Sequence, residues 1–368
     1  MQDVRAALLA GGIGERMGRL TDAVCKPMVP YAGGCRLADF SMANAVRSGV
    51  PQTVVMSHHL QRDLLDHLLR RWDGRGGMHV HLGPYDRLLD GADRGRGLPP
   101  GMVLPERAGE AGTADALLTN AEWLFAGDCR DILVQHADHV YNFDYRPMLG
   151  EHRATGADVT IGVQRIERRF VRLFGMVDLD ADGRVRALVE KPAEPTSDLV
   201  FTAFCLFRAD TLDKVLTELN QRPADEWQHD ISRDVLPYMI SEGFGVRAFP
   251  VGGYWADIGT VERYLLGHLD LIRSPDALPL TEIPLTLPGA RPELVRGTGV
   301  ISSEPMPDGA QVTDSVLYLG CALEPGARVE RSVVLPGARV SAGVELLDSI
   351  ALAGETLTKS RSGLAALT

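Results

Sequence analysis

Short apolar segments alternate with longer segments of helical spacing along roughly the first 270 residues of the chain. Apolar runs of a few residues predict buried strands, whereas apolar residues three and four positions apart predict amphipathic helices. We therefore expect strands over residues 4–10, 52–57, 132–136 and 158–164, and helices over residues 37–48, 60–72, 145–155 and 231–240. Strands that alternate with helices in this way favour an α/β fold with a mixed, mostly parallel sheet covered by helices.

Two segments lack this alternation. Residues 74–101 are rich in Gly, Arg and Asp, which predicts a long loop or lid. Residues 274–296 are rich in Pro and Leu without a clear period, and we interpret them as a linker. The predicted domains are therefore residues 1–273 and residues 297–368.

The second domain has an internal repeat of 17 residues. Three series of positions recur at this spacing: Gly309, Gly326 and Gly343; Ser315, Ser332 and Ser349; Gly320, Gly337 and Gly354. Three short apolar strands per repeat, each followed by a turn, are what one coil of a triangular β-helix requires. About three coils make a small domain, so we expect it to pack on the first domain or on a partner subunit.

Composition restricts the possible partners. Hydrophobic residues make up 45% of the chain and charged residues 24%, as in an ordinary globular protein. No apolar run approaches the ~20 residues of a membrane span, and the apolar N-terminal stretch is too short for a secretory signal. The net charge of −11 argues against nucleic-acid binding, and five scattered cysteines support neither a disulfide framework nor a zinc site. We expect a cytoplasmic protein without membrane or nucleic-acid partners.

A glycine-rich loop follows the first predicted strand and contains Gly11, Gly12 and Gly14, with Arg16 two residues later. Glycines allow backbone N–H groups to approach a phosphate chain or a base, and the Arg16 guanidinium suits phosphate oxygens. Lys26 lies beside prolines in the next segment, and it is one of only four lysines among 38 basic residues. The loop lacks the third glycine of a dinucleotide-binding motif and the Gly-Lys-Ser/Thr of a Walker A motif.

Further motifs follow the loop in order along the chain. They are Cys25-Lys26-Pro27, Leu37-Ala38-Asp39-Phe40, Gly112-Thr113-Ala114-Asp115-Ala116, Ala137-Asp138-His139-Val140-Tyr141, Phe174-Gly175-Met176-Val177, Glu190-Lys191-Pro192, His229-Asp230 and Tyr254-Trp255-Ala256-Asp257-Ile258-Gly259-Thr260. In these motifs nearly the whole chain resembles the sugar-1-phosphate nucleotidyltransferases, and among them the bacterial glucose-1-phosphate adenylyltransferases (ADP-glucose pyrophosphorylases). The resemblance implies a Rossmann-like catalytic domain followed by a left-handed parallel β-helix, in agreement with the two-domain prediction.

The resemblance also implies a reaction and a set of site residues. A sugar-1-phosphate oxygen attacks the α-phosphorus of a nucleoside triphosphate, pyrophosphate leaves, and positioning and charge neutralisation accelerate the step. Asp138 and Asp257 would hold Mg²⁺, and we expect both at the carboxyl edge of the sheet because each follows an apolar strand. Arg16 and Lys26 would hold the triphosphate, and Lys191 the sugar phosphate. The nucleotide would also contact Leu9, Ala10, Gly11, Gly12, Gly14, His58, Gly112, Thr113 and Asp138, and the sugar phosphate Glu190, Phe201, Thr202, Trp255 and Asp257.

Several of these residue types also have ordinary structural roles. Asp138 could be an ordinary acidic residue at the end of a strand, and Lys191 a solvated cation in a loop. Asp230 could be the N-cap of the helix that follows it. The adjacent His58 and His59 have a poor spacing for a metal site. The Asp-rich segment 178–183 reads better as a hairpin turn than as a metal-binding motif.

Four departures from the family's pattern concern specificity. Val24-Cys25 replaces the usual Arg-Ala before Lys26, and Gly109-Glu110-Ala111 replaces a segment with an aromatic pair. Phe201-Thr202-Ala203 replaces a Ser-Met-Gly segment that touches glucose, and His58 aligns with about the position of a glutamine near the base. The phosphate and metal groups are retained while the base and sugar groups change.

A pocket with Phe201 in place of a serine should bind a less polar ring. We therefore expect Mg²⁺-dependent transfer from GTP to a cyclitol 1-phosphate similar to valienol 1-phosphate, as in the cyclitol-phosphate branch of the family that serves antibiotic and pseudo-oligosaccharide biosynthesis. The alternative is glucose-1-phosphate adenylyltransfer for glycogen synthesis. A second alternative is a non-catalytic regulatory subunit, and a β-helix acyltransferase is a third. The resemblance favours a homodimer or homotetramer.

Overall fold

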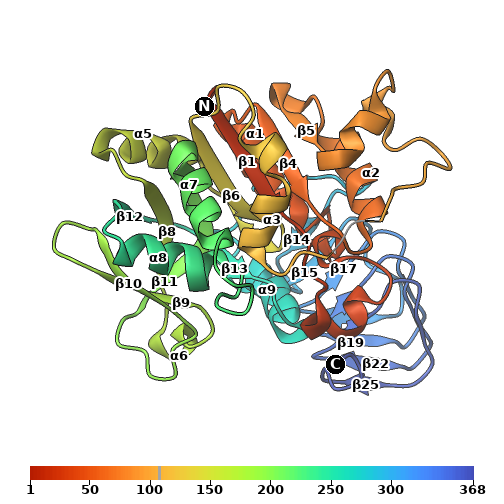
Figure 1. The fold of residues 1–368 in the computed structure, drawn as a ribbon. Coiled ribbons are helices and arrows are strands. Elements are labelled where there is room, and N and C mark those ends of the chain that lie inside the picture. Colours follow the sequence, from red (N-terminus) through yellow and green to blue (C-terminus); the bar gives the residue numbers. More distant parts are fainter. Residues whose placement is uncertain (107–108) are drawn as a thin grey trace. The chain divides into compact units, whose positions relative to one another are not determined.

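The computed structural model describes residues 1–106 and 109–368, and they group into two compact units (Figure 1). Unit 1 comprises Met1–Gly11, Asn44–His136 and Phe143–Gly252. Unit 2 comprises Gly12–Ala43, Ala137–Asn142 and Gly253–Thr368. Each unit therefore contains several separate stretches of the chain, and the boundaries at residues 273 and 297 stay predictions.

Unit 1 contains the mixed sheet that the alternating pattern predicts. Its main path runs β10-β9-β11-β6-β1-β4-β5, with β8 paired to β11 and β12 paired to β8. The segment β6-β1-β4-β5 is parallel, whereas β11 runs antiparallel to β6, β8 and β9. The strands are β1 (Val4–Leu9), β4 (Gln52–Met56), β5 (His79–His81), β6 (Asp131–His136), β8 (Val159–Arg165), β9 (Gly175–Leu179), β10 (Val185–Glu190), β11 (Leu199–Arg208) and β12 (Val246–Pro250).

Helices lie along this sheet (Figure 1). Buried leucines of α3, α7 and the segment after residue 230 share one apolar core with β1, β6 and β8, because each helix has its apolar residues on one side. The helices are α1 (Ala38–Ser48), α2 (Gln61–Trp72), α3 (Thr113–Thr119), α4 (Ala121–Leu124), α5 (Tyr145–Thr155), α6 (Arg168–Val171), α7 (Ala209–Asn220), the π-helical turn η6 (Ile231–Val235) and α8 (Leu236–Ser241). The strands and helices predicted from periodicity are thus confirmed to within a few residues.

The prediction of one long loop over residues 74–101 is wrong. This segment contains β5, which pairs in parallel with β4, and the short 3-10 helices η3 (Arg75–Gly77), η4 (Gly83–Leu89) and η5 (Arg94–Arg96). Met78, Val80 and Leu82 alternate with polar residues around β5 and are buried, and Arg94 contacts both Asp73 and Asp86 at 3.1 Å. The hairpin predicted at 178–183 is confirmed, since β9 and β10 pair antiparallel on either side of it.

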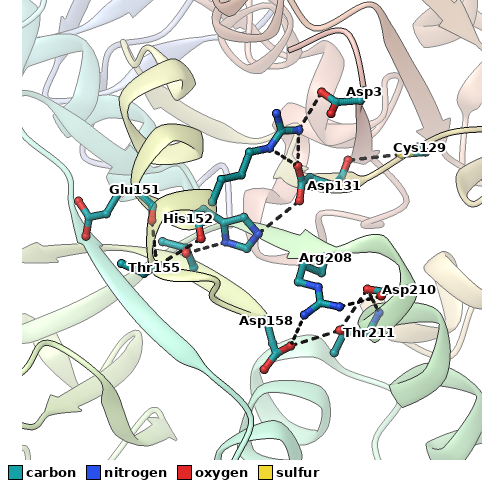
Figure 2. A network of polar contacts seen from close by, with 12 residues as sticks. Asp3, Cys129, Asp131, Glu151, His152, Thr155, Asp158, Arg208, Asp210 and Thr211 are labelled. Carbon is teal, nitrogen blue, oxygen red and sulfur yellow. Dashed lines mark hydrogen bonds and ion pairs between the residues drawn. The ribbon is translucent and has the colours of Figure 1, made fainter.

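A polar network joins the start of β6 to α5 (Figure 2). Asp131, only 1% exposed, accepts hydrogen bonds of 2.8 and 2.5 Å from the Arg153 guanidinium, and its second oxygen lies 3.4 Å from Nε2 of His152. Arg153 also contacts Asp3 at 2.8 Å, and His152 bonds Thr160 of β8 at 2.8 Å. A buried carboxylate requires such donors, so this network fixes α5 against two strands of the sheet.

Unit 2 contains the β-helix, in which the strands of the repeat pair with strands 17 residues further along. The first and last pairings, Ile301 with Val316 and Leu346 with Arg361, span 15 residues. Gln311 pairs with Arg328, Val316 with Val333 and Ala322 with Arg339, all in parallel. Three sheets result: β15-β17-β20-β23 with β14 antiparallel at its edge, β16-β19-β22-β25, and β18-β21-β24. Their strands are β14 (Glu293–Val295), β15 (Val300–Ser302), β16 (Gln311–Thr313), β17 (Val316–Leu317), β18 (Ala322–Leu323), β19 (Arg328–Glu330), β20 (Val333–Val334), β21 (Arg339–Val340), β22 (Glu345–Leu347), β23 (Ile350–Ala351), β24 (Thr356–Leu357) and β25 (Arg361–Ser362).

The repeated serines form a ladder inside the coils. The backbone N–H of Ser332 donates to Oγ of Ser315 at 3.1 Å, and that of Ser349 donates to Oγ of Ser332 at 3.1 Å. All three serines are fully buried. The repeat thus provides hydrogen bonds as well as apolar packing, which explains why a serine recurs at this position.

The rest of unit 2 packs on one side of the β-helix and shares a core with it. This part contains the 3-10 helices η1 (Glu15–Thr21), η2 (Lys26–Met28) and η7 (Leu280–Glu282), the strands β2 (Pro30–Tyr31), β3 (Cys35–Arg36), β7 (His139–Tyr141) and β13 (Trp255–Asp257), and the helix α9 (Val261–Arg273). Buried residues from η1, α9 and the β-helix, including Met17, Tyr264 and Ile350, belong to this core. The segment predicted as a linker, 274–296, contains η7 and β14.

Two contacts connect this core with the end of the chain and with α9. The N–H of Arg19 donates to the carbonyl oxygen of Leu367 at 2.9 Å, and Gly18, at φ 49°, leaves room for that oxygen, since a Cβ there would clash with it. His268 of α9 is fully buried and accepts from the Ala32 N–H at 3.2 Å. Its Nε2 also lies 3.0 Å from the hydroxyl of Tyr318 in the β-helix.

Across the described residues no helix is long and apolar enough to cross a membrane.

Candidate active site

Two short strands of unit 2 bring Asp138 and Asp257 together. β7 begins directly after Asp138, and β13 ends at Asp257; the two strands pair antiparallel with His139 opposite Asp257. The N–H of Ile258 donates to the carbonyl of Asp138 at 3.3 Å. The expectation that both residues end strands of the main sheet is therefore wrong for Asp257, which a separate two-stranded sheet positions.

His139 lies between the two carboxylates. Its Nε2 is 3.7 Å from Oδ1 of Asp138 and 3.9 Å from Oδ1 of Asp257, and the side chain is 9% exposed. Both Oδ1 atoms therefore face the same atom. The ring of Trp255 packs edge-on against that of His139 at 5.5 Å, which fixes the imidazole. Two carboxylate oxygens turned to one point, beside an imidazole nitrogen, are a suitable donor set for a divalent cation.

A basic side chain contacts the Oδ2 atom of each carboxylate, the oxygen that does not face His139. Lys26, almost fully buried, forms an ion pair with Oδ2 of Asp138. Arg263 of α9 donates to Oδ2 of Asp257 at 2.6 Å. These contacts leave the Oδ1 atoms on the side of His139, and they partly neutralise two carboxylates that would otherwise repel each other.

The glycine-rich loop continues in unit 2 and packs on Lys26. Gly14 has a φ of 79°, and a Cβ there would lie 3.1 Å from Cβ of Lys26 and from the methyl group of Thr21. Thr21 donates to the carbonyl of Gly14 at 3.1 Å. Arg16 and Gly12 are exposed. The loop therefore has a glycine where Lys26 approaches it, and Arg16 is accessible to a ligand.

In unit 1, Gly11 lies against His58 and Glu110. Leu9 and Ala10 are buried at the end of β1, and the Ala10 N–H donates to Met56 at 2.8 Å. A Cβ at Gly11 would approach the His58 ring to 2.9 Å and Oε2 of Glu110 to 3.2 Å. His58 and Glu110 are two positions at which the sequence departs from the family's pattern. Both side chains lie against Gly11, the first glycine of the loop.

Gly112 and Thr113 have structural partners in unit 1. A Cβ at Gly112 would clash with the carbonyl oxygen of His229, and the Ala114 N–H donates to this same oxygen at 2.8 Å. The Thr113 hydroxyl donates to Asp230 at 3.1 Å. Asp230 accepts from the N–H groups of Ser232 and Arg233, so its predicted role as a helix N-cap is confirmed. Packing accounts for both residues, and their contact with nucleotide stays a prediction.

Two of the residues expected to contact the sugar phosphate, Glu190 and Phe201, lie against Gly175, whereas Trp255 and Asp257 belong to β13 of unit 2. Glu190 pairs with Gly175 across β10 and β9, and a Cβ at Gly175 would lie 3.1 Å from Oε2 of Glu190 and 3.6 Å from Cβ of Phe201. Lys191 has a φ of 49°, is 44% exposed and lies 3.3 Å from Glu190. A non-glycine residue in this conformation is strained, which is common at ligand-binding positions.

The segment of β11 that we expect to contact the sugar is irregular where it departs from the family's pattern. Phe201 is buried, Thr202 is fully buried, and Ala203 has a φ of 60° where the pairing with β8 shifts register. Ala203 replaces the glycine of the family's pattern at a position whose conformation favours glycine. The substituted segment therefore keeps a backbone bulge while its side chains change.

Sequence reasoning gave no role to His139, Arg263 or Glu110. His139 and Glu110 stood in quoted segments, but only the strand pairing and the Gly11 contact reveal what they face. Arg263 follows Asp257 by six residues, and its direction depends on the Thr260 cap of α9, which accepts from the Arg263 N–H at 3.2 Å. The sequence feature that could have pointed to Arg263 was its position three residues after Thr260, in the first turn of a capped helix.

Comparison with known proteins identifies the family. Residues 5–274 match the profile of the family described as "Nucleotidyl transferase". The chain belongs to this family. It is 48% identical over 341 residues to valienol-1-phosphate guanylyltransferase of Streptomyces hygroscopicus subsp. limoneus, covering 89% of this chain and 88% of the relative.

The nucleotidyltransferase is also 33% identical over 346 residues to glucose-1-phosphate adenylyltransferase of Thermotoga neapolitana, covering 90% of this chain and 77% of the relative. A third relative, glucose-1-phosphate adenylyltransferase of Thermomicrobium roseum, is 36% identical over 286 residues, covering 76% of this chain and 62% of that protein. The predicted family is therefore confirmed, and the chain is an enzyme of the sugar-1-phosphate nucleotidyltransferase class. The mixed α/β sheet and the β-helix agree with the predicted fold class.

Proposed function

We propose that this nucleotidyltransferase transfers GMP from GTP to a cyclitol 1-phosphate similar to valienol 1-phosphate, in the biosynthesis of an antibiotic or pseudo-oligosaccharide. A phosphate oxygen of the acceptor attacks the α-phosphorus of GTP, the α–β phosphoanhydride bond breaks, and pyrophosphate leaves. The products are GDP-cyclitol and pyrophosphate. We expect the enzyme to act in the cytoplasm as a homodimer or homotetramer.

The observation that carries the choice of acceptor is the position of Phe201. This side chain is buried beside Gly175, which Glu190 also approaches, and Lys191 lies 3.3 Å from Glu190. A phenylalanine here offers apolar surface to a ring and no hydroxyl partner for it, which favours an unsaturated carbocycle over a pyranose. The 48% identity to a valienol-1-phosphate guanylyltransferase supports the same choice.

Asp138 and Asp257 would hold Mg²⁺ through the oxygens that face His139. When bound, the ion would orient the phosphates and stabilise the charge that develops on pyrophosphate. Lys26 is held beside Asp138 and can turn its ammonium group to the triphosphate, and the exposed Arg16 can bind the same group bidentately. Lys191 binds the acceptor phosphate from a strained backbone position that Glu190 supports. These residues position the reactants and neutralise charge, and the reaction needs little else from the protein.

Pyrophosphate release over a substrate matrix tests the proposal. Four nucleoside triphosphates with Mg²⁺ would be crossed with glucose, glucosamine, mannose and valienol 1-phosphates, with Asp138→Asn as the inactive control. We expect turnover with GTP and valienol 1-phosphate. Turnover confined to ATP and glucose 1-phosphate would contradict the proposed acceptor and establish the glycogen-type activity, which the 33% identical relative supports.

The regulatory-subunit alternative predicts a different result in the same experiment. A non-catalytic chain would release no pyrophosphate in any combination, whatever the acceptor. The retention of Asp138, Asp257, Lys26 and Lys191 argues for catalysis. Equilibrium binding of nucleotide by a chain that shows no turnover would then favour the regulatory role.

A further inference from the structure

A cavity of about 370 Å³ lies at the edge of the unit 1 sheet where its parallel strands begin. Its walls come from the starts of β1 and β4, from β5 and from the segment that precedes β6. Pockets for small ligands typically have volumes of about 300–1,000 Å³. The length of β1 separates this cavity from the glycine-rich loop at the other end of the strand by about 16 Å.

Three polar side chains form a row across the cavity. Arg5 of β1 pairs with Gln52 of β4, and Gln52 pairs with His79 of β5, in the parallel register of the sheet. Paired residues on neighbouring strands have their side chains on the same face, so a guanidinium, an amide and an imidazole lie side by side. The nitrogens of His79 lie 3.5 Å from Asp73 and 3.4 Å from Asp86, and these contacts hold the ring at one end of the row.

Arg5 is held firmly in this row, yet part of its guanidinium is left for a ligand. Its Nη1 donates to the carbonyl oxygens of Trp123, Leu124 and Ala126 at 2.7 to 2.9 Å, and its Nε donates to Oε1 of Gln52 at 2.8 Å. Nη2 makes no hydrogen bond with any residue that the structure describes, and neither does the amide nitrogen of Gln52. A guanidinium whose plane is already fixed loses little conformational freedom when it binds an anion.

Asp128 supplies the opposite charge. It lines the cavity, is exposed, and has no hydrogen-bond or ion-pair partner in the described part of the chain. Ala126, which contacts Arg5, precedes Asp128 by two residues, and two residues span at most about 7 Å. The other carboxylate of the lining, Asp3, already pairs with Arg153 at 2.8 Å (Figure 2). The cavity therefore presents one positive and one negative group that no ion pair joins.

We propose that this cavity binds a small zwitterion, with its carboxylate on Arg5 and Gln52 and its ammonium group on Asp128. A carboxylate accepts from a guanidinium N–H and from a neighbouring amide N–H at the same time, and such charge-assisted hydrogen bonds are short and strong. A ligand with only one charge leaves the other charged side chain without a partner, so it binds more weakly. The inference does not depend on the proposed function, because the cavity contains none of the predicted catalytic or substrate-binding residues.

Saturation-transfer NMR titrations of the full-length protein test the inference. The probes are 4-aminobutyrate and 6-aminohexanoate, which carry both charges on chains of two lengths, and butylamine and butyrate, which carry one charge each. At least one of the two amino acids should bind at least about tenfold more tightly than butylamine and butyrate, because a hydrogen bond to a charged group contributes at least that much. Equal affinities for all four probes, or no saturable binding of either amino acid, would overturn the inference.

Two substitutions of similar shape assign the two ends of the ligand. Asp128→Asn removes the charge that the ammonium group needs, so the affinity for the amino acid should fall about tenfold while that for butyrate stays unchanged. Gln52→Glu keeps an acceptor for Arg5 but adds a carboxylate where the anion binds. The affinities for the amino acid and for butyrate should then fall about tenfold, and that for butylamine should not.

Asp225→Asn is the matched control, since Asp225 is an exposed acid of unit 1 outside the cavity, and it should bind the probes as the wild type does. Wild-type affinity for the amino acid in Asp128→Asn or in Gln52→Glu would contradict the assigned contacts.

Competition distinguishes this cavity from the predicted reaction site. GTP with Mg²⁺ and valienol 1-phosphate should both leave the amino acid bound, because they share no predicted residue with the cavity. Displacement of the amino acid by either substrate would place it in the reaction site and overturn the inference. Bound amino acid in a protein that shows no turnover in the substrate matrix would contradict the proposed function alone.

Discussion

The guanidinium of Arg263 donates a 2.6 Å hydrogen bond to Oδ2 of Asp257. The two residues belong to different elements: Asp257 ends β13, and Arg263 lies in the first turn of α9. Thr260 caps this helix and accepts from the Arg263 N–H. The first turn of α9 therefore directs the Arg263 side chain towards Asp257. The carboxylate is thereby held in one orientation, with Oδ1 on the side of His139.

We predict that Arg263→Gln weakens metal binding without unfolding the protein. Partners that orient metal ligands typically contribute about 10- to 100-fold in metal affinity. Mn²⁺ titration followed by electron paramagnetic resonance should show a dissociation constant raised by about this factor. Arg87→Gln removes an exposed arginine from an ion pair with Glu122 and serves as the control. Equal Mn²⁺ affinity in the two variants would exclude the positioning role of Arg263.

We predict that Phe201→Ser shifts acceptor preference towards glucose 1-phosphate. The serine hydroxyl restores a polar partner, and loss of the ring removes the apolar surface on which the carbocycle is expected to lie. The ratio of kcat/KM for valienol 1-phosphate to that for glucose 1-phosphate should fall by at least about tenfold. Phe201→Leu keeps the apolar character and should retain the wild-type preference. The melting temperatures of both variants should also be measured, because truncating a buried phenylalanine costs about 3–5 kcal/mol of folding stability.

His268 should make unit 2 less stable in mild acid. Burial lowers the pKa of His268 to about 4, whereas its Nδ1 hydrogen bond to the Tyr264 carbonyl favours the charged form only weakly. The folded state therefore binds a proton less readily than the unfolded state, whose His pKa is about 6.5. Stability from this group is complete above pH 6.5 and declines as pH falls towards 4, by about 3 kcal/mol in total.

The variant His268→Gln tests this dependence. It should melt at a lower temperature than the wild type at pH 7, since the Ala32 N–H loses its imidazole acceptor, but its melting temperature should depend less on pH between 6.5 and 4. His59→Gln, at a partly exposed histidine, is the control and should follow the wild-type curve. Parallel curves for the wild type and His268→Gln would contradict the prediction.

Asp131 should stabilise unit 1 through the network of Figure 2. Burial alone would raise the pKa of Asp131, but hydrogen bonds from His152 and Arg153 outweigh it, and the pKa lies below the ordinary value. Asp131→Asn removes a buried carboxylate that accepts two hydrogen bonds from Arg153, whose side chain is 27% exposed. We expect it to lower the free energy of unfolding in urea by about 3 kcal/mol at pH 7.

The difference between Asp131→Asn and the wild type should shrink as pH falls. A carboxylate with a lowered pKa stabilises the folded state above its unfolded pKa of about 4, and this stabilisation is lost as it is protonated at lower pH. Asp178→Asn, in an exposed pair with Arg186, should cost less than about 1 kcal/mol at pH 7. A cost for Asp131→Asn as small as this would show that the network contributes little.

The elements with a clear period were predictable, and the contacts between them were not. Helix α5 coincides with the predicted range 145–155, and the 17-residue spacing gave the register of the β-helix, because local periodicity alone specifies both. The segment 74–101 was mistaken for a loop because β5 has only three residues, and the short alternation of Met78, Val80 and Leu82 stands among many Gly, Arg and Asp residues.

In the candidate site, too, the residues were predictable and the contacts between them were not. Asp138, Asp257 and Lys26 were found because they stand in motifs, but the direction of each side chain depends on tertiary pairing. That Asp257 faces His139 follows from the antiparallel register of β13 and β7, two strands of three residues each. The approach of His58 and Glu110 to Gly11 joins segments about 50 residues apart in sequence, and no local pattern records it.

The contact of Leu367 with Gly18 and Arg19 has a consequence for how the β-helix can evolve. In most solenoids a repeat can be gained or lost with little effect elsewhere, because each coil touches only its neighbours. Here one extra 17-residue coil would shift the last residues of the chain by about 4.8 Å along the stack. The carbonyl oxygen of Leu367 would then leave the loop that carries Arg16. The number of coils is therefore constrained by the contact between Leu367 and η1, and a repeat array has acquired a fixed length.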